Sequence, residues 1–183
     1  MNSIKNERIK FFLQHEERIR EWADLETEVI KFADRFYRSL KGDIDAAIRS
    51  GEIDGDGVES FLSGEGYTGL CLRRQDWPKS SENPQVRLEW HTKRTGFRSN
   101  GSLVCGVRTT VEEYRLQFTK EARPAYPNQN SWWPAYRNVE PPAGKFWEGD
   151  NLKEYRNYLV TTIVNAWKDL APLVDQAVGH QSS

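Results

Sequence analysis

The spacing of apolar residues changes at Tyr67, and this change constrains the fold more than any other feature of the sequence. Before Tyr67, apolar side chains recur every three or four residues, which is typical of an amphipathic helix. After it, apolar and polar residues alternate, which is typical of a strand with one buried face. The sequence therefore predicts a helical part over residues 1–66 and a sheet part over residues 67–122.

The helical part contains several predicted helices. One is expected over residues 3–22 and a second over residues 25–40, although one continuous helix fits the spacing equally well. Asp43 is the expected N-cap of a short helix over residues 44–49. A further short helical stretch is expected over residues 58–62. The apolar stripe of the first two helices consists of Ile9, Phe12, Leu13, Ile19, Trp22, Leu25, Val29, Phe32, Phe36 and Leu40.

The sheet part contains three predicted strands, which begin near residues 67, 86 and 103. Turn-rich loops connect them, so an antiparallel meander is expected. Residues 111–120 fit two structures: Val111, Tyr114 and Phe118 share a helical face, while the alternation around Leu116 suits a fourth strand. The helix is favoured, and the sheet is expected to have three to four strands.

The rest of the chain divides into a loop and a helix. Residues 123–149 hold five prolines and no sustained period, and they predict a long ordered loop rich in aromatic residues. A C-terminal helix is expected over residues 150–178, with Pro172 bending or ending it. Residues 1–183 are thus predicted to form a single α+β domain, an antiparallel sheet packed by N-terminal helices and a long C-terminal helix.

Charge is segregated along the chain, although the net charge is only -1. Residues 1–66 carry a net charge of -5, residues 67–137 of +6 and residues 138–183 of -2. Aromatic residues make up 12% of the chain, which excludes wholesale disorder. No apolar run approaches the roughly 20 residues of a membrane span, and two cysteines are too few for a disulfide framework. We therefore expect a cytoplasmic protein without membrane contact.

Motifs for catalysis, cofactors and metals are weak. Residues 64–69 match G-x-G-x-x-G, but a helix precedes them and a strand follows, the reverse of a dinucleotide site. Asp54 and Asp56 resemble the start of a calcium loop, and Glu65 falls at its twelfth place, but Val58 and Glu59 stand where the loop needs a ligand and a glycine. We expect no cofactor, no metal site and no catalytic residue. A divergent Mg²⁺-dependent nuclease using Glu89 and His91 is the least favoured of three functional hypotheses.

Two sets of residues are candidates for binding. A basic set in the sheet part is suited to phosphates and stacked bases; it consists of Arg73, Arg74, Arg87, His91, Lys93, Arg94, Arg98 and Arg108. An aromatic string in the loop has the composition of protein interfaces; it contains Trp132, Trp133, Tyr136 and Arg137. Protein–protein interaction is the favoured hypothesis, and nucleic-acid binding through the basic sheet is the alternative.

Each of these binding hypotheses has a structural alternative. The acidic helices could neutralise the basic sheet within the molecule. The tryptophans could pin the loop onto the core, with one of the pair exposed. The N-terminal helices also offer a surface for forming a homo-oligomer, in addition to an unidentified protein partner.

An ordered set of short strings runs through residues 67–175. It consists of Leu88-Glu89-Trp90, Val104-Cys105-Gly106-Val107-Arg108 and Trp132-Trp133-Pro134-Ala135-Tyr136-Arg137, followed by a Pro-Pro pair, Trp147 and an amphipathic helix. This order resembles the C-terminal, non-catalytic portion of bacterial PD-(D/E)XK nuclease-superfamily proteins. Nuclease members of that family carry (D/E)-x-K, in which carboxylates hold Mg²⁺ and a lysine positions the attacking water. No lysine here follows an acidic residue by two places, so the resemblance implies a recognition part of a bacterial or phage nuclease or defence system.

Overall fold

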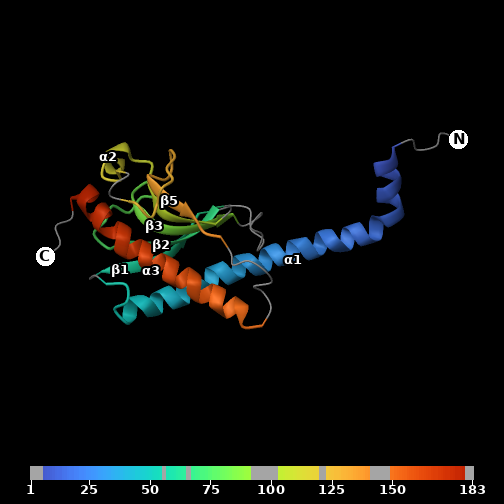
Figure 1. Cartoon of the computed structure of the whole chain (residues 1–183), viewed down its shortest axis with the longest axis horizontal. Coiled ribbons are helices and arrows are strands. Elements are labelled where there is room, and N and C mark those ends of the chain that lie inside the picture. The colour runs from blue at the N-terminus through green and yellow to red at the C-terminus, as the bar shows by residue number, and fades with distance from the viewer. Residues whose placement is uncertain are drawn as a thin grey trace.

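The computed structural model describes residues 6–54, 57–64, 67–91, 103–119, 123–140 and 149–179. In these ranges the chain forms helices at both ends and an antiparallel sheet between them (Figure 1). The elements are α1 (Glu7–Arg49), β1 (Val58–Ser63), β2 (Tyr67–Arg74), β3 (Gln85–His91), β4 (Leu103–Arg108), α2 (Glu112–Arg115), β5 (Ala135–Asn138) and α3 (Asn151–Val178). The α+β class predicted from the sequence is confirmed.

The N-terminal helical residues form one long helix, α1. Asn6 is its N-cap, and its side-chain oxygen accepts a hydrogen bond from the Arg8 N–H at 3.0 Å. The helix is kinked at His15, whose φ and ψ are -126° and 17°. The continuous alternative is therefore confirmed, and the predicted cap at Asp43 is wrong. Asp43 lies inside α1, where its carboxylate pairs with Arg156 of α3 at 2.7 Å.

The predicted helical stretch at residues 58–62 is wrong, because these residues form the edge strand β1. The strand pairs with β2 along its whole length, with Phe61 opposite Cys71. Gly57 and Gly64 flank it with φ of 70° and 90°, a region that favours glycine and suits tight turns. Its three apolar residues, Val58, Phe61 and Leu62, have the spacing of a helical face, and pairing with β2 overrides this local pattern.

The sheet has five strands, so the expected three to four is corrected. Their order is β1-β2-β3-β4-β5 and every pair is antiparallel, as the meander prediction required. β5 lies within the predicted loop at residues 123–149. Its four residues show no clear alternation, and it is defined by pairing with β4, where Arg137 lies opposite Cys105. The favoured helix near residue 111 is confirmed as α2, and the fourth strand proposed there is wrong.

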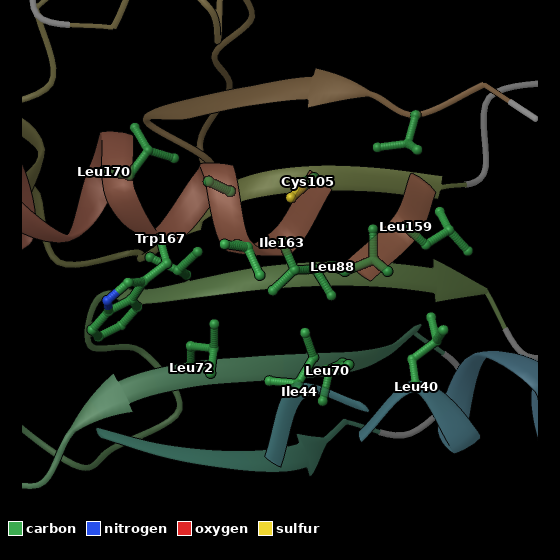
Figure 2. Close-up of a cluster of buried hydrophobic side chains, with 14 of the residues drawn as sticks. Leu40, Ile44, Leu70, Leu72, Leu88, Cys105, Leu159, Ile163, Trp167 and Leu170 are labelled. Carbon is green, nitrogen blue, oxygen red and sulfur yellow. The ribbon is translucent and has the colours of Figure 1, made fainter. Parts of the chain in front are cut away.

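Helices α1 and α3 pack on the same face of the sheet and enclose the core (Figures 1 and 2). The enclosed side chains include Leu40 and Ile44 of α1, Leu70, Leu72, Leu88 and Cys105 of the strands, and Leu159, Ile163, Trp167 and Leu170 of α3. Pro172 lies inside α3, so the prediction that it ends the helix is wrong. Pro172 is exposed, and Val174 and Asp175 beyond it are buried, so packing holds the last turn in place.

Within the described ranges, no helix has the length and apolar composition needed to cross a bilayer.

Candidate functional site

Residues 7–32 of α1, here called the arm, extend beyond the rest of the molecule (Figure 1). Ala33 is the first buried residue of α1. At 1.5 Å per residue the arm is about 39 Å long along its bent path. The strands span only six to eight residues in β1 and β2, or roughly 20–27 Å. The sheet is therefore too short to cover the whole of α1.

The arm carries large apolar side chains that are exposed to solvent. Trp22 is 67% exposed and Leu25 is 57% exposed. The set considered below consists of Ile9, Phe11, Phe12, Leu13, Trp22, Leu25 and Val29. The sequence predicted that the N-terminal helices pack on the sheet, and this holds only from Ala33 onward. Folded proteins rarely expose large apolar patches, so the arm is a candidate site for an interaction.

The arm joins the body through a set of polar contacts just after its end. The Asp34 carboxylate accepts a hydrogen bond from the Trp90 indole N–H at 2.8 Å and pairs with Arg38 at 2.7 Å. Arg38 also donates to the Thr68 hydroxyl on β2 at 3.2 Å. These contacts attach the base of the arm to β2 and β3, so the arm leaves the sheet in a defined direction.

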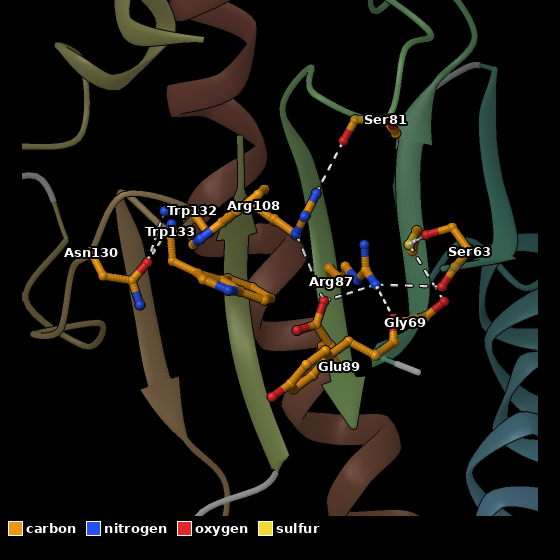
Figure 3. Close-up of polar contacts among 11 residues, drawn as sticks. Ser63, Gly69, Ser81, Arg87, Glu89, Arg108, Asn130, Trp132 and Trp133 are labelled. Atoms are coloured by element: carbon orange, nitrogen blue, oxygen red, sulfur yellow. Dashed lines mark hydrogen bonds and ion pairs between the residues drawn. The ribbon is translucent and has the colours of Figure 1, made fainter. Parts of the chain in front are cut away.

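The face of the sheet opposite α1 and α3 is here called the polar face. At its centre lies the Arg87–Glu89–Arg108 cluster (Figure 3). The Glu89 Oε2 atom lies 2.8 Å from Arg87 Nη2 and 3.8 Å from Arg108 Nε. Arg87 Nη2 also donates to the Tyr67 carbonyl at 2.9 Å, and Arg108 Nη1 donates to the Ser81 carbonyl at 3.1 Å.

Small residues of the neighbouring strands make room for the Arg87 side chain. Arg87 lies opposite Cys71 on β2 and Gly106 on β4. Its guanidinium crosses Gly69, where an added Cβ would lie only 1.8 Å from Arg87 Nε. The missing side chain at Gly69 is therefore what allows Arg87 to lie flat on β2 and reach the carbonyl of Tyr67.

Burial controls the electrostatics of this cluster. Burial raises the pKa of the Glu89 carboxyl, and the attraction of Arg87 and Arg108 offsets only part of that rise. Burial and the nearby positive charge of Arg87 lower the pKa of Arg108. The Arg87 Nε atom is buried without a hydrogen-bond partner. The cluster thus carries one carboxylate between two guanidinium groups in a poorly solvated place.

Stability should depend on the protonation of Glu89. Because its folded-state pKa is raised, its contribution to stability is complete below the unfolded pKa of about 4.3 and is lost as pH rises through the folded pKa. We expect the free energy of unfolding of wild type, relative to Glu89→Gln, to fall as the pH rises above the unfolded pKa of about 4.3. Urea unfolding at several pH values measures this. Glu112→Gln removes a carboxylate that is 86% exposed and controls for the change in charge. A difference in free energy of unfolding between wild type and Glu89→Gln that does not vary with pH would contradict the prediction.

Arg73, Arg87 and Arg108 share the polar face of the sheet, as the sequence predicted. Arg73 lies on the polar face, paired with Glu59 and placed over the Phe61 ring at 4.4 Å. Arg74 points to the opposite face, where it pairs with Asp175 of α3 at 3.0 Å. The acidic partners come from β1, β3 and α3, whereas the sequence pointed to the N-terminal helices. Lys93, Arg94 and Arg98 lie outside the described residues.

Two further contacts complete the polar face and the loop beside it. The His91 ring meets the Tyr67 ring edge to face at 4.5 Å. Arg108 lies over the Trp132 ring at 5.0 Å, and Trp132 is 53% exposed. Trp133 is buried, so the prediction that one tryptophan anchors the loop while the other is exposed is confirmed.

The aromatic string is held by local hydrogen bonds and by stacking. The Asn130 side-chain oxygen accepts from the backbone N–H groups of Trp132 at 2.9 Å and Trp133 at 3.0 Å (Figure 3). Tyr136 is half-buried in β5, with its ring 6.0 Å from that of Trp133. Arg137 stacks over Tyr126 at 5.6 Å. The four residues predicted as one binding string therefore take different structural positions.

Sequence reasoning missed two features of the site. It treated the arm residues as core, although the length of α1 relative to the strands is a signal that part of the helix must project. It also missed the glycines that accommodate Arg87 and β5. Gly69 and Gly106 within alternating strands are the available signal, because glycine in a strand often marks a close approach of other atoms.

Among the described residues, no three His, Cys, Asp or Glu side chains are grouped so that they could hold a metal ion. No family model, curated protein or solved structure matches this chain. The resemblance to PD-(D/E)XK proteins thus stays a prediction from the sequence.

Proposed function

We propose that this chain is a non-catalytic recognition or regulatory protein that acts through protein–protein interaction, with the arm as its docking element. One observation carries the proposal, namely the exposed apolar side chains of the arm from Ile9 to Val29. Water contact at these side chains is unfavourable by roughly 25 cal/mol for each Å² of apolar surface. A partner that covers them removes this cost.

The kind of residue on the arm also supports docking. Amphipathic helices bind partners through anchors spaced three, four and seven residues apart. Trp22, Leu25 and Val29 have this spacing, and tryptophan is among the residues enriched at positions that dominate binding energy. The contacts of Asp34 attach the base of the arm to the body, and the three anchors lie beyond it, away from the sheet.

The alternative hypotheses have less support. The arginines of the polar face that are described, Arg73, Arg87 and Arg108, each have a carboxylate partner, which weakens their attraction for phosphates. Nucleic-acid binding stays a prediction, as does a nuclease using Glu89 and His91. A partner from a bacterial or phage nuclease or defence system is a further part of the proposal, and it rests on the sequence resemblance alone.

Site-specific photo-crosslinking tests the docking role of the arm. A photoreactive phenylalanine derivative is placed at Trp22 in the full chain and irradiated in the native host. The matched control is the same derivative at Leu116, which is 70% exposed and lies outside the arm. We expect adducts several-fold more abundant from position 22 than from position 116. Equal adducts from both positions, or none from position 22, would overturn the proposal.

A further inference from the structure

We propose that the straight part of the arm, residues 15–32, docks into an apolar groove of another protein, and that lysine or arginine side chains line the rim of that groove. This inference rests on the proposed function, because it names the chemistry of the partner that the docking element takes. Residues 7–14 are not part of the proposed site, since the kink at His15 turns them out of line with the straight part (Figure 1).

The apolar anchors of the straight part form one continuous row. On an α-helix, residues three or four positions apart are neighbours on the surface. Leu25 is three residues after Trp22 and four before Val29, so the three side chains follow one another along the helix. Each is 48–67% exposed. We call these three residues the anchor row, and its spacing is that of helices that bind in apolar grooves.

Three carboxylates lie directly beside the anchor row. Glu21 is four residues before Leu25, Glu28 is three after it, and Glu26 is four after Trp22. At 3.6 residues per turn, Glu21 and Glu28 lie on one side of the row and Glu26 on the other. All three are exposed, and none has an ion-pair partner among the residues that the structure describes. Negative charge that is free to meet a partner therefore borders both sides of the row.

The basic residues of the straight part are fewer and mostly lie elsewhere. Arg20 is on the side away from the anchor row, where it pairs with Glu16 at 2.6 Å, and Lys31 is not a neighbour of any anchor. Arg18, four residues before Trp22, is the one cation beside the row. Over residues 15–32, six acidic and three basic residues give a net charge of -3. The surface around the anchors is therefore negative.

This charge distinguishes between the surfaces that can cover an apolar helix face. Helices that lie on membranes carry lysine and arginine beside their apolar face, because the lipid surface is negative. Carboxylates in those positions would be repelled, and a second copy of the arm would bring the same carboxylates. A protein groove with a basic rim buries the anchors and pairs with the carboxylates at its edge. Charge complementarity therefore favours a basic protein partner.

The salt dependence of docking tests the basic rim. The full chain, with a photoreactive phenylalanine derivative at Trp22, is irradiated in an extract of the native host at increasing salt concentration. We expect the yield of protein adducts to fall several-fold between about 0.1 M and about 1 M salt, because the screening length decreases from about 10 Å to about 3 Å. An undiminished yield would overturn the inference, since apolar contacts alone would then hold the partner, but it would leave the docking role of the arm intact.

Reversing the charges beside the anchor row tests where the rim makes contact. In the same labelled chain, Glu21→Lys combined with Glu26→Lys is expected to lower the adduct yield several-fold. The matched control is Glu17→Lys combined with Asp24→Lys, which changes the net charge equally within the straight part. Neither control residue lies three or four positions from an anchor. Circular dichroism checks that both variants keep their helix content, and equal yields from the two would overturn the inference.

Other occupants of the arm would be recognised in the same experiments. An adduct of twice the chain mass of 21.3 kDa would indicate a second copy, and sedimentation of the full chain with phosphatidylserine vesicles would indicate a membrane. Either result would overturn the inference. Salt-sensitive adducts to a different protein, weakened more by the charge changes beside the row than by the control changes, support it. The absence of any adduct from position 22 would overturn both the inference and the proposed function.

Discussion

Replacing Asp175 with alanine is expected to lower the free energy of unfolding by about 3–5 kcal/mol, because it breaks a buried ion pair by removing one partner. The Asp175 side chain is only 7% exposed and accepts hydrogen bonds from Arg74 Nε at 3.0 Å and the Trp77 indole N–H at 2.8 Å. Without the Asp175 carboxylate, the charged Arg74 side chain, which is only 16% exposed, has no ion-pair partner there. Urea unfolding followed by circular dichroism measures the change.

Two further variants identify the cause of this loss. Asp175→Asn keeps an acceptor for Trp77 but not the charge, so its loss should lie between wild type and Asp175→Ala. Combining Arg74→Met with Asp175→Leu removes both charges and should recover most of the stability. If Asp175→Ala loses less than about 1 kcal/mol, which is the usual worth of an exposed pair, the buried ion pair is not a main link between β2 and α3.

Replacing Gly106 with alanine is expected to lower the free energy of unfolding by at least about 2 kcal/mol through overpacking. A Cβ at this position would lie 2.1 Å from the Ala135 carbonyl oxygen and 2.6 Å from the Tyr136 Cα. Both are backbone atoms of β5, so they can yield only if the strand moves. Urea unfolding measures the decrease in the free energy of unfolding. Hydrogen exchange at the β5 amides should also be faster than in wild type.

The matched control for this variant is Gly42→Ala. Gly42 lies inside α1 and an added Cβ there would meet nothing within 4 Å. Since alanine is the better helix former by about 1 kcal/mol, this change should raise stability. Equal behaviour of the two variants would contradict the role assigned to the close approach of β4 and β5.

The fold could be predicted where one pattern extends over many residues. The last helix was expected over residues 150–178 and forms over Asn151–Val178. The three central strands were found from their alternation. β1 and β5 were missed because they have only six and four residues, and strands this short are determined by hydrogen bonds to a distant neighbour. The local sequence does not indicate which strand that neighbour is.

The candidate site was less predictable for a related reason. The sequence placed Arg73, Arg87 and Arg108 on one side of the sheet, and the register agrees with this. Their pairing with Glu59 and Glu89 depends on distances across and along the strands, which alternation does not give. Exposure of the arm depends on the size of the sheet beneath α1. The apolar stripe itself is the same in its exposed and its buried half.

The shared carboxylate at the base of the arm gives the molecule a mechanical property. Asp34 contacts both the Trp90 side chain of β3 and Arg38 of α1, so the helix is attached to the strand that also carries Arg87 and Glu89. The part of the arm between the kink at His15 and its base is about 28 Å long, and a lever of this length amplifies movement at its attachment. A rotation of about 5° at Asp34 moves the kink by roughly 2.5 Å, close to half the pitch of an α-helix. Small rearrangements of β3 would therefore reach the tip of the arm as displacements large enough to change which residues meet there.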